Sequence, residues 1–308
     1  MKKTIALIFA LCLVGGVCPE PMRIVNTTPL TASAEDTNFE ELYKEVYTEG
    51  ALTYGIDRDY AAVIQCSKDA RGEIAIPDNI NGVTVNIIAE GAFKDCTGIT
   101  AVTIPESVVT VDEYAFSGCT SLKTVKNRAD LQWLADYAFS NCKSLEGFLN
   151  PVFVQSSDVL SGCTSLKSLE IADLSDTSFS YNNFIGGLRF IDCPNLESVI
   201  IPESCVILSL VRFENCPSLK EIVLPQNTSS PIKIKIIGCD NLSRIKLPLT
   251  TNSYESTSVY ISNCNNVSEL TFLNYLKVRT SRVKIQIQDM PALEKIEMSV
   301  GAESLEIS

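Results

Sequence analysis

Apolar residues recur along the chain at fixed distances from a column of cysteines that are 21 to 30 residues apart. The pattern is clearest in two copies of one phrase, Tyr114–Leu122 and Tyr137–Leu145. A bulky apolar residue lies three positions before each column member, three after it and six after it. A fixed period of this length is typical of a repeat architecture. The column consists of Cys96, Cys119, Cys142, Cys163, Cys193, Cys216, Cys239, Cys264 and, in the last repeat, Met290.

The end of each repeat alternates between two sets of side chains, which indicates a β-strand. In the segment that begins at Leu219, Ile222 faces one way together with Leu224. Glu221 and Val223 face the other way. One such unit cannot bury its apolar face alone. We therefore expect the repeats to stack, share one core and pair their strands in parallel.

The repeats after Cys163 contain a second alternating segment. In Ile232–Ile236 and in Val283–Ile287, apolar residues occupy every second position. This period predicts a second strand in each of these coils. The C-terminal half should therefore form a solenoid with two sheets.

The run Ile104-Pro105-Glu106-Ser107-Val108, continued to Leu122, resembles the BspA-type repeat of the leucine-rich-repeat family. The resemblance extends from about Val85 to the C-terminus, although the Ala-Phe pair of this repeat is lost after Cys163. It implies a fold of the α/β class leaning to all-β: a right-handed leucine-rich-repeat solenoid with a parallel sheet and about nine coils. It also implies a non-catalytic role in adhesion to host or matrix proteins or in cell–cell contact.

The first 34 residues read as a secretory signal. Two lysines precede the apolar region Ile5–Val17, and the small-x-small site Ala32–Ala34 predicts cleavage after Ala34. The apolar run is too short for a membrane span of about 20 residues. Cys18 leaves lipidation as an alternative. We therefore expect a secreted or cell-surface protein with no membrane span.

Residues 35–86 precede the repeat domain, which we assign to residues 87–308, and we expect them to form an α+β cap over the first coil. Apolar residues at helical spacing predict a helix over Phe39–Tyr47, with Asn38 as its N-cap. Leu52–Gln65 reads as a hairpin that turns near Asp57–Asp59. The dipeptide Asn81-Gly82 predicts a further tight turn.

The longest interval of the cysteine column contains the additional segment Asp173–Gly187. This segment is either a binding loop or a tolerated surface insertion. The sequence ends at Ser308, shortly after a repeat. Either another chain covers the last coil, for example by self-association, or the sequence is part of a longer product.

The chain contains no histidine, which removes Ser-His-Asp and Cys-His nucleophile pairs and histidine metal sites. No motif places two acidic residues in one pocket, and the sequence has neither a P-loop nor a dinucleotide fingerprint. We therefore expect no enzymatic activity, no cofactor and no metal. The net charge is −12, and −14 without residues 1–34. This excess of acid argues against nucleic acid as a partner.

The chain has 12 cysteines, and an even number in an exported protein usually suggests disulfides. Here the column argues otherwise, because equivalent side chains in stacked coils point the same way rather than at each other. We therefore expect buried thiols that act as small apolar residues. A linear column also lacks the convergent ligands of a zinc site.

The outward positions of the first strand in each coil are where we expect a partner to bind. Apolar residues at some of these positions lie among charged ones, as in many protein interfaces. The expected partner is an extracellular host or matrix protein. Glycan binding or processing and a purely structural envelope role are the alternatives. The candidate partner-binding residues are Leu149, Glu170, Ile200, Glu221, Val223, Arg244 and Lys246.

Overall fold

The computed structural model describes twelve stretches of the 308-residue chain. They are residues 43–127, 131, 133–148, 158–170, 184–185, 187–205, 207–208, 210–225, 232–248, 257–273, 283–298 and 304–307. The secretory signal expected in residues 1–34 lies outside them. Within these stretches every helix or strand is a β-strand, so the fold is all-β.

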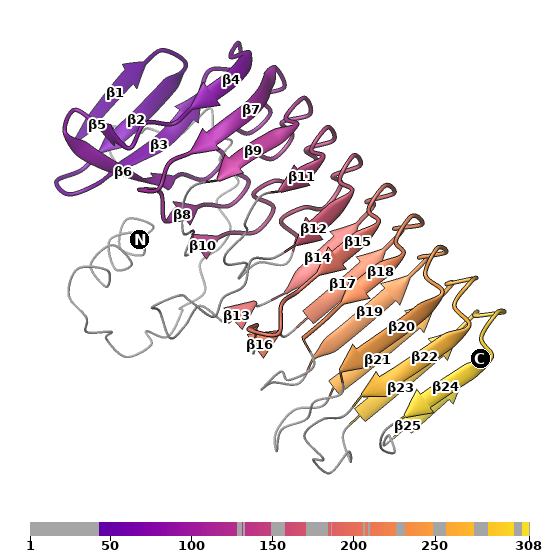
Figure 1. Ribbon diagram of the computed structural model, residues 1–308. Helices are drawn as coiled ribbons and strands as arrows, with labels where there is room; N and C mark the ends of the chain where they lie inside the picture. The colour runs from indigo at the N-terminus through magenta and orange to yellow at the C-terminus, as the bar shows by residue number, and fades with distance from the viewer. Residues whose placement is uncertain are drawn as a thin grey trace, which may run out of the picture.

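The coils stack into an elongated solenoid, and the first strand of each coil adds to a parallel sheet along one side (Figure 1). The residues six positions after the column cysteines pair with one another: Val102 with Val125, and Val199 with Ile222. The predicted parallel stacking is therefore confirmed. Seven strands form one unbroken sheet: β4 (Gly72–Ala75), β7 (Ile99–Ile104), β9 (Thr124–Asn127), β11 (Gly147–Phe148), β12 (Ser168–Glu170), β15 (Ser198–Ile200) and β18 (Glu221–Val223).

A separate three-stranded sheet continues this side beyond β18: β20 (Arg244–Pro248), β22 (Glu269–Leu273) and β24 (Lys295–Met298). Strand β20 lies next to β18. The number of turns in the unbroken ladder therefore differs from the nine coils predicted. Among the described residues the ladder has seven strands, because it is interrupted between β18 and β20 and because β4 precedes the first column cysteine. We call these two sheets together the first side.

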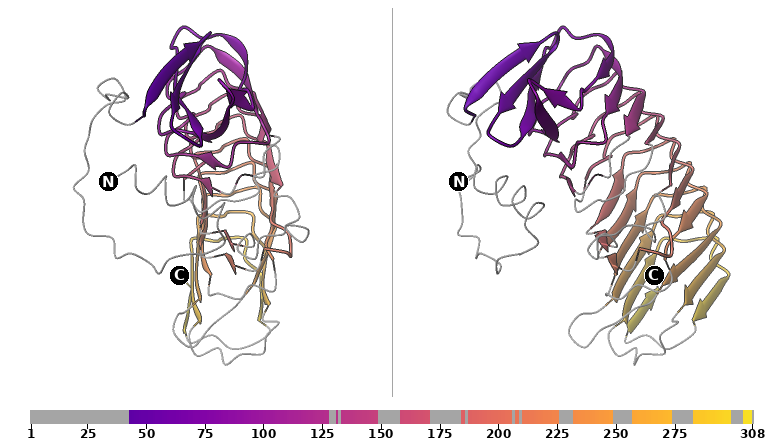
Figure 2. Two further views of the ribbon diagram at one scale, coloured as in Figure 1. Left: turned by 90° about the vertical axis from the view of Figure 1, so that its left-hand side faces the viewer. Right: turned by 60° about the vertical axis from the view of Figure 1, so that its left-hand side comes forward.

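The second side of the solenoid is a six-stranded parallel sheet in the C-terminal half. It contains both alternating segments that the sequence indicated, so the predicted second strand is confirmed. In the left view of Figure 2, the two sides face each other across the core. The strands are β14 (Leu188–Ile191), β17 (Leu210–Glu214), β19 (Lys233–Ile237), β21 (Thr257–Ser262), β23 (Val283–Gln288) and β25 (Ser304–Ile307).

The additional segment Asp173–Gly187 lies mostly outside the described residues. Its described part includes β13 (Phe184–Ile185), which pairs in parallel with β16 (Ile207–Leu208). The end of this segment is therefore tied to the next coil by a short ladder.

A seven-stranded mixed sheet covers the N-terminal end of the solenoid. Its strands β8 and β10 belong to the first coils, so the covering sheet and the coils are one hydrogen-bonded unit. The strands are β1 (Glu45–Glu49), β2 (Leu52–Ile56), β3 (Ala61–Cys66), β5 (Asn79–Ile80), β6 (Val83–Ile88), β8 (Thr110–Val111) and β10 (Trp133–Leu134).

The helix predicted over Phe39–Tyr47 is wrong where the structure can test it, because residues 45–47 belong to β1. This strand pairs antiparallel with β2, so that Val46 lies opposite Gly55. The segment Glu45–Glu49 contains β-branched and aromatic residues, which favour a strand once a neighbouring strand is available. The antiparallel partner therefore overrides the helical spacing. The rest of the predicted helix lies outside the described residues, and the described part of the cap, residues 43–86, contains strands and no helix, so it is all-β instead of α+β.

Both predicted turns are present. Strands β2 and β3 form the hairpin, and the Asp57 backbone N–H donates to the carbonyl oxygen of Tyr60 at 2.9 Å. Asn81 and Gly82 have φ angles of 51° and 78° between β5 and β6, which are antiparallel. Two positive φ angles are the requirement of a type I′ turn.

The core is built from the predicted apolar columns. Leu122, Leu219 and Val125 are fully buried. Equivalent phenylalanines stack between coils: the ring centroids of Phe116 and Phe139 are 4.8 Å apart. Each coil therefore buries its apolar side chains against the next coil, as the repeat pattern requires.

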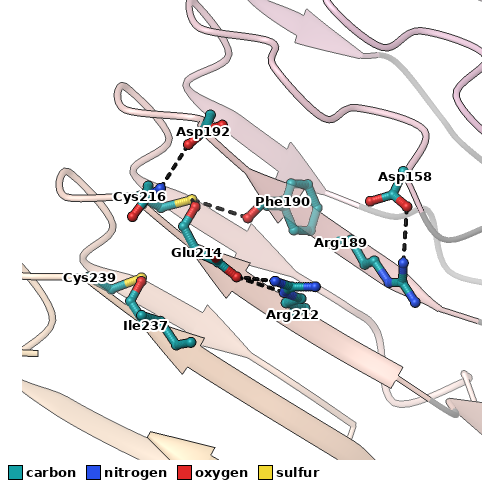
Figure 3. Close-up of polar contacts among 10 residues, drawn as sticks. Asp158, Arg189, Phe190, Asp192, Arg212, Glu214, Cys216, Ile237 and Cys239 are labelled. Atoms are coloured by element: carbon teal, nitrogen blue, oxygen red, sulfur yellow. Dashed lines mark hydrogen bonds and ion pairs between the residues drawn. The ribbon is translucent and has the colours of Figure 1, made fainter. Parts of the chain in front are cut away.

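The ten cysteines of the described residues are all buried and form no disulfide. The column thiols from Cys119 to Cys216 donate to carbonyl oxygens of the preceding coil: Cys119 Sγ lies 3.0 Å from Phe93 O, and Cys216 Sγ lies 3.5 Å from Phe190 O (Figure 3). The thiols of Cys239 and Cys264 donate within their own coil, to the carbonyl oxygens of Ile237 and Ser262. Burial raises the pKa of the Cys163 thiol to about 12. The thiols from Cys119 to Cys216 therefore form a buried ladder that links neighbouring coils.

A second column, directly before the cysteines, lies in the left-handed region of φ. Only glycine, asparagine and aspartate occupy it, the residues that tolerate this conformation best. A β-carbon on Gly162 would lie 2.5 Å from Oδ1 of Asn141 in the preceding coil. Any larger residue at position 162 would therefore require the Asn141 side chain to move. The members are Asp95, Gly118, Asn141, Gly162, Asp192, Asn215, Gly238, Asn263 and Asp289.

Replacing a buried column leucine should destabilise the solenoid. For Leu219→Ala we expect a loss of about 2–5 kcal/mol in the free energy of unfolding, as for other buried leucines. Glu221→Ala, at an exposed position two residues later, should change it by less than about 0.5 kcal/mol. Urea unfolding followed by circular dichroism measures both values. Equal stability of the two variants would show that the column register is wrong.

Two glycines of the left-handed column form a matched pair. Gly238→Ala should cost about 1–2 kcal/mol for its φ of 64°, because its β-carbon would stay 3.5 Å from Asn215. Gly162→Ala has the same φ requirement and adds the overlap with Asn141, so its loss of unfolding free energy should be larger. Asn141→Gly combined with Gly162→Ala should remove the excess. Unfolding curves that rank the two single variants in the opposite order would contradict the steric argument.

The column thiols should resist alkylation in the folded protein. Iodoacetamide reacts with the thiolate, and the raised pKa and burial keep Cys163 protonated and covered near neutral pH. We expect no labelling of the ten cysteines at pH 7.5 and full labelling after denaturation in guanidinium chloride. Mass spectrometry of the unreduced protein provides the check. A disulfide between two column members would refute the thiol ladder.

Candidate functional site

Three of the predicted partner-binding residues form one registered row on the first side. Glu170 pairs with Ile200 across β12 and β15, and Ile200 pairs with Val223 across β15 and β18. All three side chains point away from the core, since their neighbours Leu169 and Val199 are buried. The structure thus places an acidic residue and two apolar residues side by side.

The exposure of these side chains differs. Val223 has 38% of its surface exposed, which is high for a large apolar residue. Ile200 is half-buried, and Glu170 and Glu221 are exposed. Leu149, the third apolar candidate, lies outside the described residues. The apolar part of the site therefore rests on Ile200 and Val223.

The two basic candidates come from the neighbouring sheet. Arg244 and Lys246 are exposed on β20, which lies next to β18. The Nε atom of Arg244 is 3.3 Å from Oε2 of Glu269. The other carboxylate oxygen of Glu269, Oε1, is 3.2 Å from Nζ of Lys295. Contacts with Glu297 and Glu269 raise the pKa of Lys295. Lys246 forms no ion pair with a described residue, so its charge is available to a partner. We call Glu170, Ile200, Glu221, Val223, Arg244 and Lys246 the first-side patch.

The second side carries a row of polar side chains that the sequence reasoning did not single out. Its members point outward between buried residues such as Phe213 and Ile236. Arg189 binds Asp158 at 3.0 Å, and Arg212 forms an ion pair with Glu214 (Figure 3). The pairing of adjacent strands places these residues in one line: Arg189, Arg212, Lys235, Tyr260, Gln286 and Glu306.

Contacts between side chains extend this line into the N-terminal coils. The rings of Tyr114 and Tyr137 stack in parallel, with centroids 5.0 Å apart. Lys94 Nζ lies 5.5 Å from the centroid of the Tyr114 ring. Tyr137 hydrogen-bonds to Asp158, whose negative charge raises the pKa of the Tyr137 hydroxyl. Asp158 in turn binds Arg189, so the two halves are joined.

A sequence signal for this row exists. Its members from Arg189 to Gln286 all lie four positions before the column cysteine or its Met290 equivalent. The alternating segments were predicted as strands, but only their apolar positions were followed. The polar residues of these segments that lie four positions before a column cysteine include Lys235 and Tyr260.

The described residues offer little for catalysis. They contain no group of three or more Cys, Asp or Glu side chains that could hold a metal ion. No helix among them has the length and apolar character needed to cross a membrane. Several acidic residues instead take part in surface ion pairs, such as Glu197 with Lys220 at 2.7 Å. The geometry therefore offers extended surfaces for binding.

Solved structures of bacterial leucine-rich-repeat proteins are similar to this chain. The T. pallidum leucine-rich-repeat protein is 25% identical, with a TM-score of 0.50, over 64% of this chain and 91% of that chain. A leucine-rich-repeat protein from Bacteroides ovatus is 15% identical, with a TM-score of 0.45, over 82% of this chain and 76% of that chain. No curated protein matches the sequence.

The family described as BspA type leucine-rich-repeat region matches residues 72–187 and 183–285, in six copies. The matched region contains the first-side patch and the cysteine column up to Cys264. It starts at β4, where the seven-stranded sheet of the first side begins. Because the match covers more than half of the chain, and the fold is the stacked solenoid that these repeats imply, this protein belongs to the BspA-type leucine-rich-repeat family.

Proposed function

We infer that this protein is a non-catalytic binding protein, exported by a bacterium, that docks an extracellular protein on its first-side patch. The observation that carries this inference is the adjacent pair Ile200 and Val223, which point outward from paired strands. Apolar side chains with charged neighbours are the usual composition of a protein interface. A host or matrix protein is the expected class of partner.

The patch is held by a rigid support. The backbones of β15 and β18 are paired, and Ile201 N–H donates to the carbonyl oxygen of Val223 at 2.9 Å. The residues directly beneath, Val199 and Leu219, are fully buried. A partner would therefore meet side chains that are already in place, which lowers the entropy lost on binding.

Charge divides the patch into two parts. Glu170 and Glu221 are exposed on the strands of the seven-stranded sheet, and Lys246 is exposed on β20. A partner with an apolar centre, a basic group over the two glutamates and an acidic group over Lys246 would complement this arrangement. Charges at the rim of an interface mainly set the association rate and its salt dependence.

The absence of histidine from the sequence supports a non-catalytic role. The expected secretory signal supports an extracellular location, secreted or at the cell surface. A purely structural envelope component would have no need of an apolar outward pair, so the patch favours binding.

The test combines a binding screen with two substitutions. The purified protein is screened by surface plasmon resonance against a panel of extracellular-matrix proteins. Ile200→Asp and Val223→Asp should each weaken the binding found by at least tenfold, because a carboxylate would be desolvated in the interface. Thr103→Asp, on β7 at the equivalent outward position, is the matched control and should bind as the unchanged protein does.

Thermal unfolding of each variant separates loss of the site from loss of the fold. We expect melting temperatures close to that of the unchanged protein, because the substituted side chains point outward. Lys246→Glu should slow association and weaken its dependence on salt. Full affinity in a variant that carries both Ile200→Asp and Val223→Asp would exclude this patch as the docking site.

A further inference from the structure

The basic residues of this acidic protein gather in one part of the chain. Residues 233–288 contain eight lysines and arginines against three acidic residues, a net charge of +5, whereas the whole chain has a net charge of −12. This segment contains β19, β21 and β23 of the second side, which carry Lys233, Lys235 and Lys284, as well as β20 and β22 of the first side, with Arg244 and Lys246 on β20. A local excess of one sign against the net charge of the chain points to a ligand of the opposite sign.

The outward side chains of these three strands form a grid of three rows. The strands are in register over their whole paired length, and the residues between the grid members, such as Ile234 and Ile236, are buried. We call this surface the second-side grid. Its rows are Lys233, Ser258 and Lys284; Lys235, Tyr260 and Gln286; and Ile237, Ser262 and Gln288. Within the third row Ser262 is buried and is not accessible to a ligand.

The grid contains three amines and no carboxylate. Lys233, Lys235 and Lys284 form no ion pair with any described residue, and Lys233 and Lys284 are exposed. Glu214 and Glu306, on the flanking strands, bind Arg212 and Gln286 respectively. The grid amines are therefore not neutralised by a carboxylate of the described part.

An aromatic ring lies at the centre of the grid. Nζ of Lys235 is 5.7 Å from the centroid of the Tyr260 ring, a distance at which a cation is attracted by the ring. The hydroxyl of Tyr260 donates to Oε1 of Gln288 at 2.9 Å, and Nε2 of Gln286 donates to Glu306 at 2.8 Å. Tyr260 is half-buried, so part of its ring is accessible.

These groups match the chemistry of an acidic sugar. Amines bind carboxylates by charge-assisted hydrogen bonds. The amides, the Ser258 hydroxyl and an aromatic ring suit the hydroxyls and C–H faces of a sugar. Ile237 is the one aliphatic residue of the grid, so the apolar centre of a protein interface is lacking.

The spacing of the charges adds a constraint. Lys233 and Lys284 occupy one row and are separated by two strand spacings, or about 9–10 Å. This distance is comparable to the length of a disaccharide unit in an extended glycan. A ligand that follows the row would therefore present one anionic group for every two sugars.

We propose that the second-side grid binds a linear acidic polysaccharide that carries a uronate carboxylate on every second sugar. The polymer lies across β19, β21 and β23, along the length of the solenoid. Lys233 and Lys284 bind successive carboxylates, and Tyr260 contacts the sugar between them. This site is on the opposite side from the first-side patch and does not depend on it (Figure 2).

The experiment uses the purified full chain and a hyaluronan octasaccharide, which carries a carboxylate on alternate sugars. Isothermal titration calorimetry at low salt should show saturable binding that weakens as salt is added. Lys233→Gln with Lys284→Gln should weaken it at least tenfold. Lys123→Gln with Lys143→Gln, which removes two exposed charges from the N-terminal coils, is the matched control and should leave it unchanged.

Three comparisons decide whether the site recognises a uronate glycan. Tyr260→Ala should weaken hyaluronan binding several-fold, whereas neutral maltooctaose should not bind. Equal binding of poly-glutamate that is insensitive to Tyr260→Ala would show attraction by charge alone and overturn the proposal. Binding of heparin without binding of hyaluronan, or no binding of hyaluronan at all, would also overturn it. Circular dichroism melts confirm that each variant is folded.

Discussion

No coil of this protein can bury its own apolar side chains, so each coil depends on its neighbours for its core. Leu219 and its equivalents are fully buried only because another coil stacks on them. The same contact supplies a partner for the column thiols from Cys119 to Cys216, as in the bond from Cys119 Sγ to Phe93 O in the preceding coil. The residue before each column member has a positive φ, in the left-handed region. The turn at this point therefore has the same backbone geometry in every coil, which keeps successive coils in register.

This dependence between coils fixes the inward positions and leaves the outward ones free to vary. Inward positions are restricted to apolar residues of a size that packs against the equivalent residues of the neighbouring coils. Outward positions are restricted only by their neighbours on adjacent strands, and they line up in rows because the strands pair in parallel. Chemical differences along the molecule therefore appear as rows and patches on a constant scaffold. The outward rows are therefore where differences in binding chemistry between coils can arise.

The two sides differ in the rows they present. The first side offers an apolar pair, Ile200 and Val223, with charged neighbours. The second side offers the amines of Lys233, Lys235 and Lys284 together with amides and the aromatic ring of Tyr260. An apolar pair suits a protein surface, and a cationic polar grid suits an acidic glycan. The two proposed ligands would approach from opposite sides, so binding of one would leave the other site open.

The sequence by itself determined the repeats, their parallel strands, the second strand of the later coils and the buried cysteine column. These follow from local periodicity, because each column residue faces the core in every coil. The sequence failed at Glu45–Tyr47, where helical spacing was overridden by pairing with β2. It predicted the outward orientation of Ile200 and Val223 but did not single out the row of Lys235 and Tyr260. Which outward residues become neighbours depends on the register between strands of different coils. Because the column members are 21 to 30 residues apart, the sequence does not give this register, and only the paired strands of the structure do.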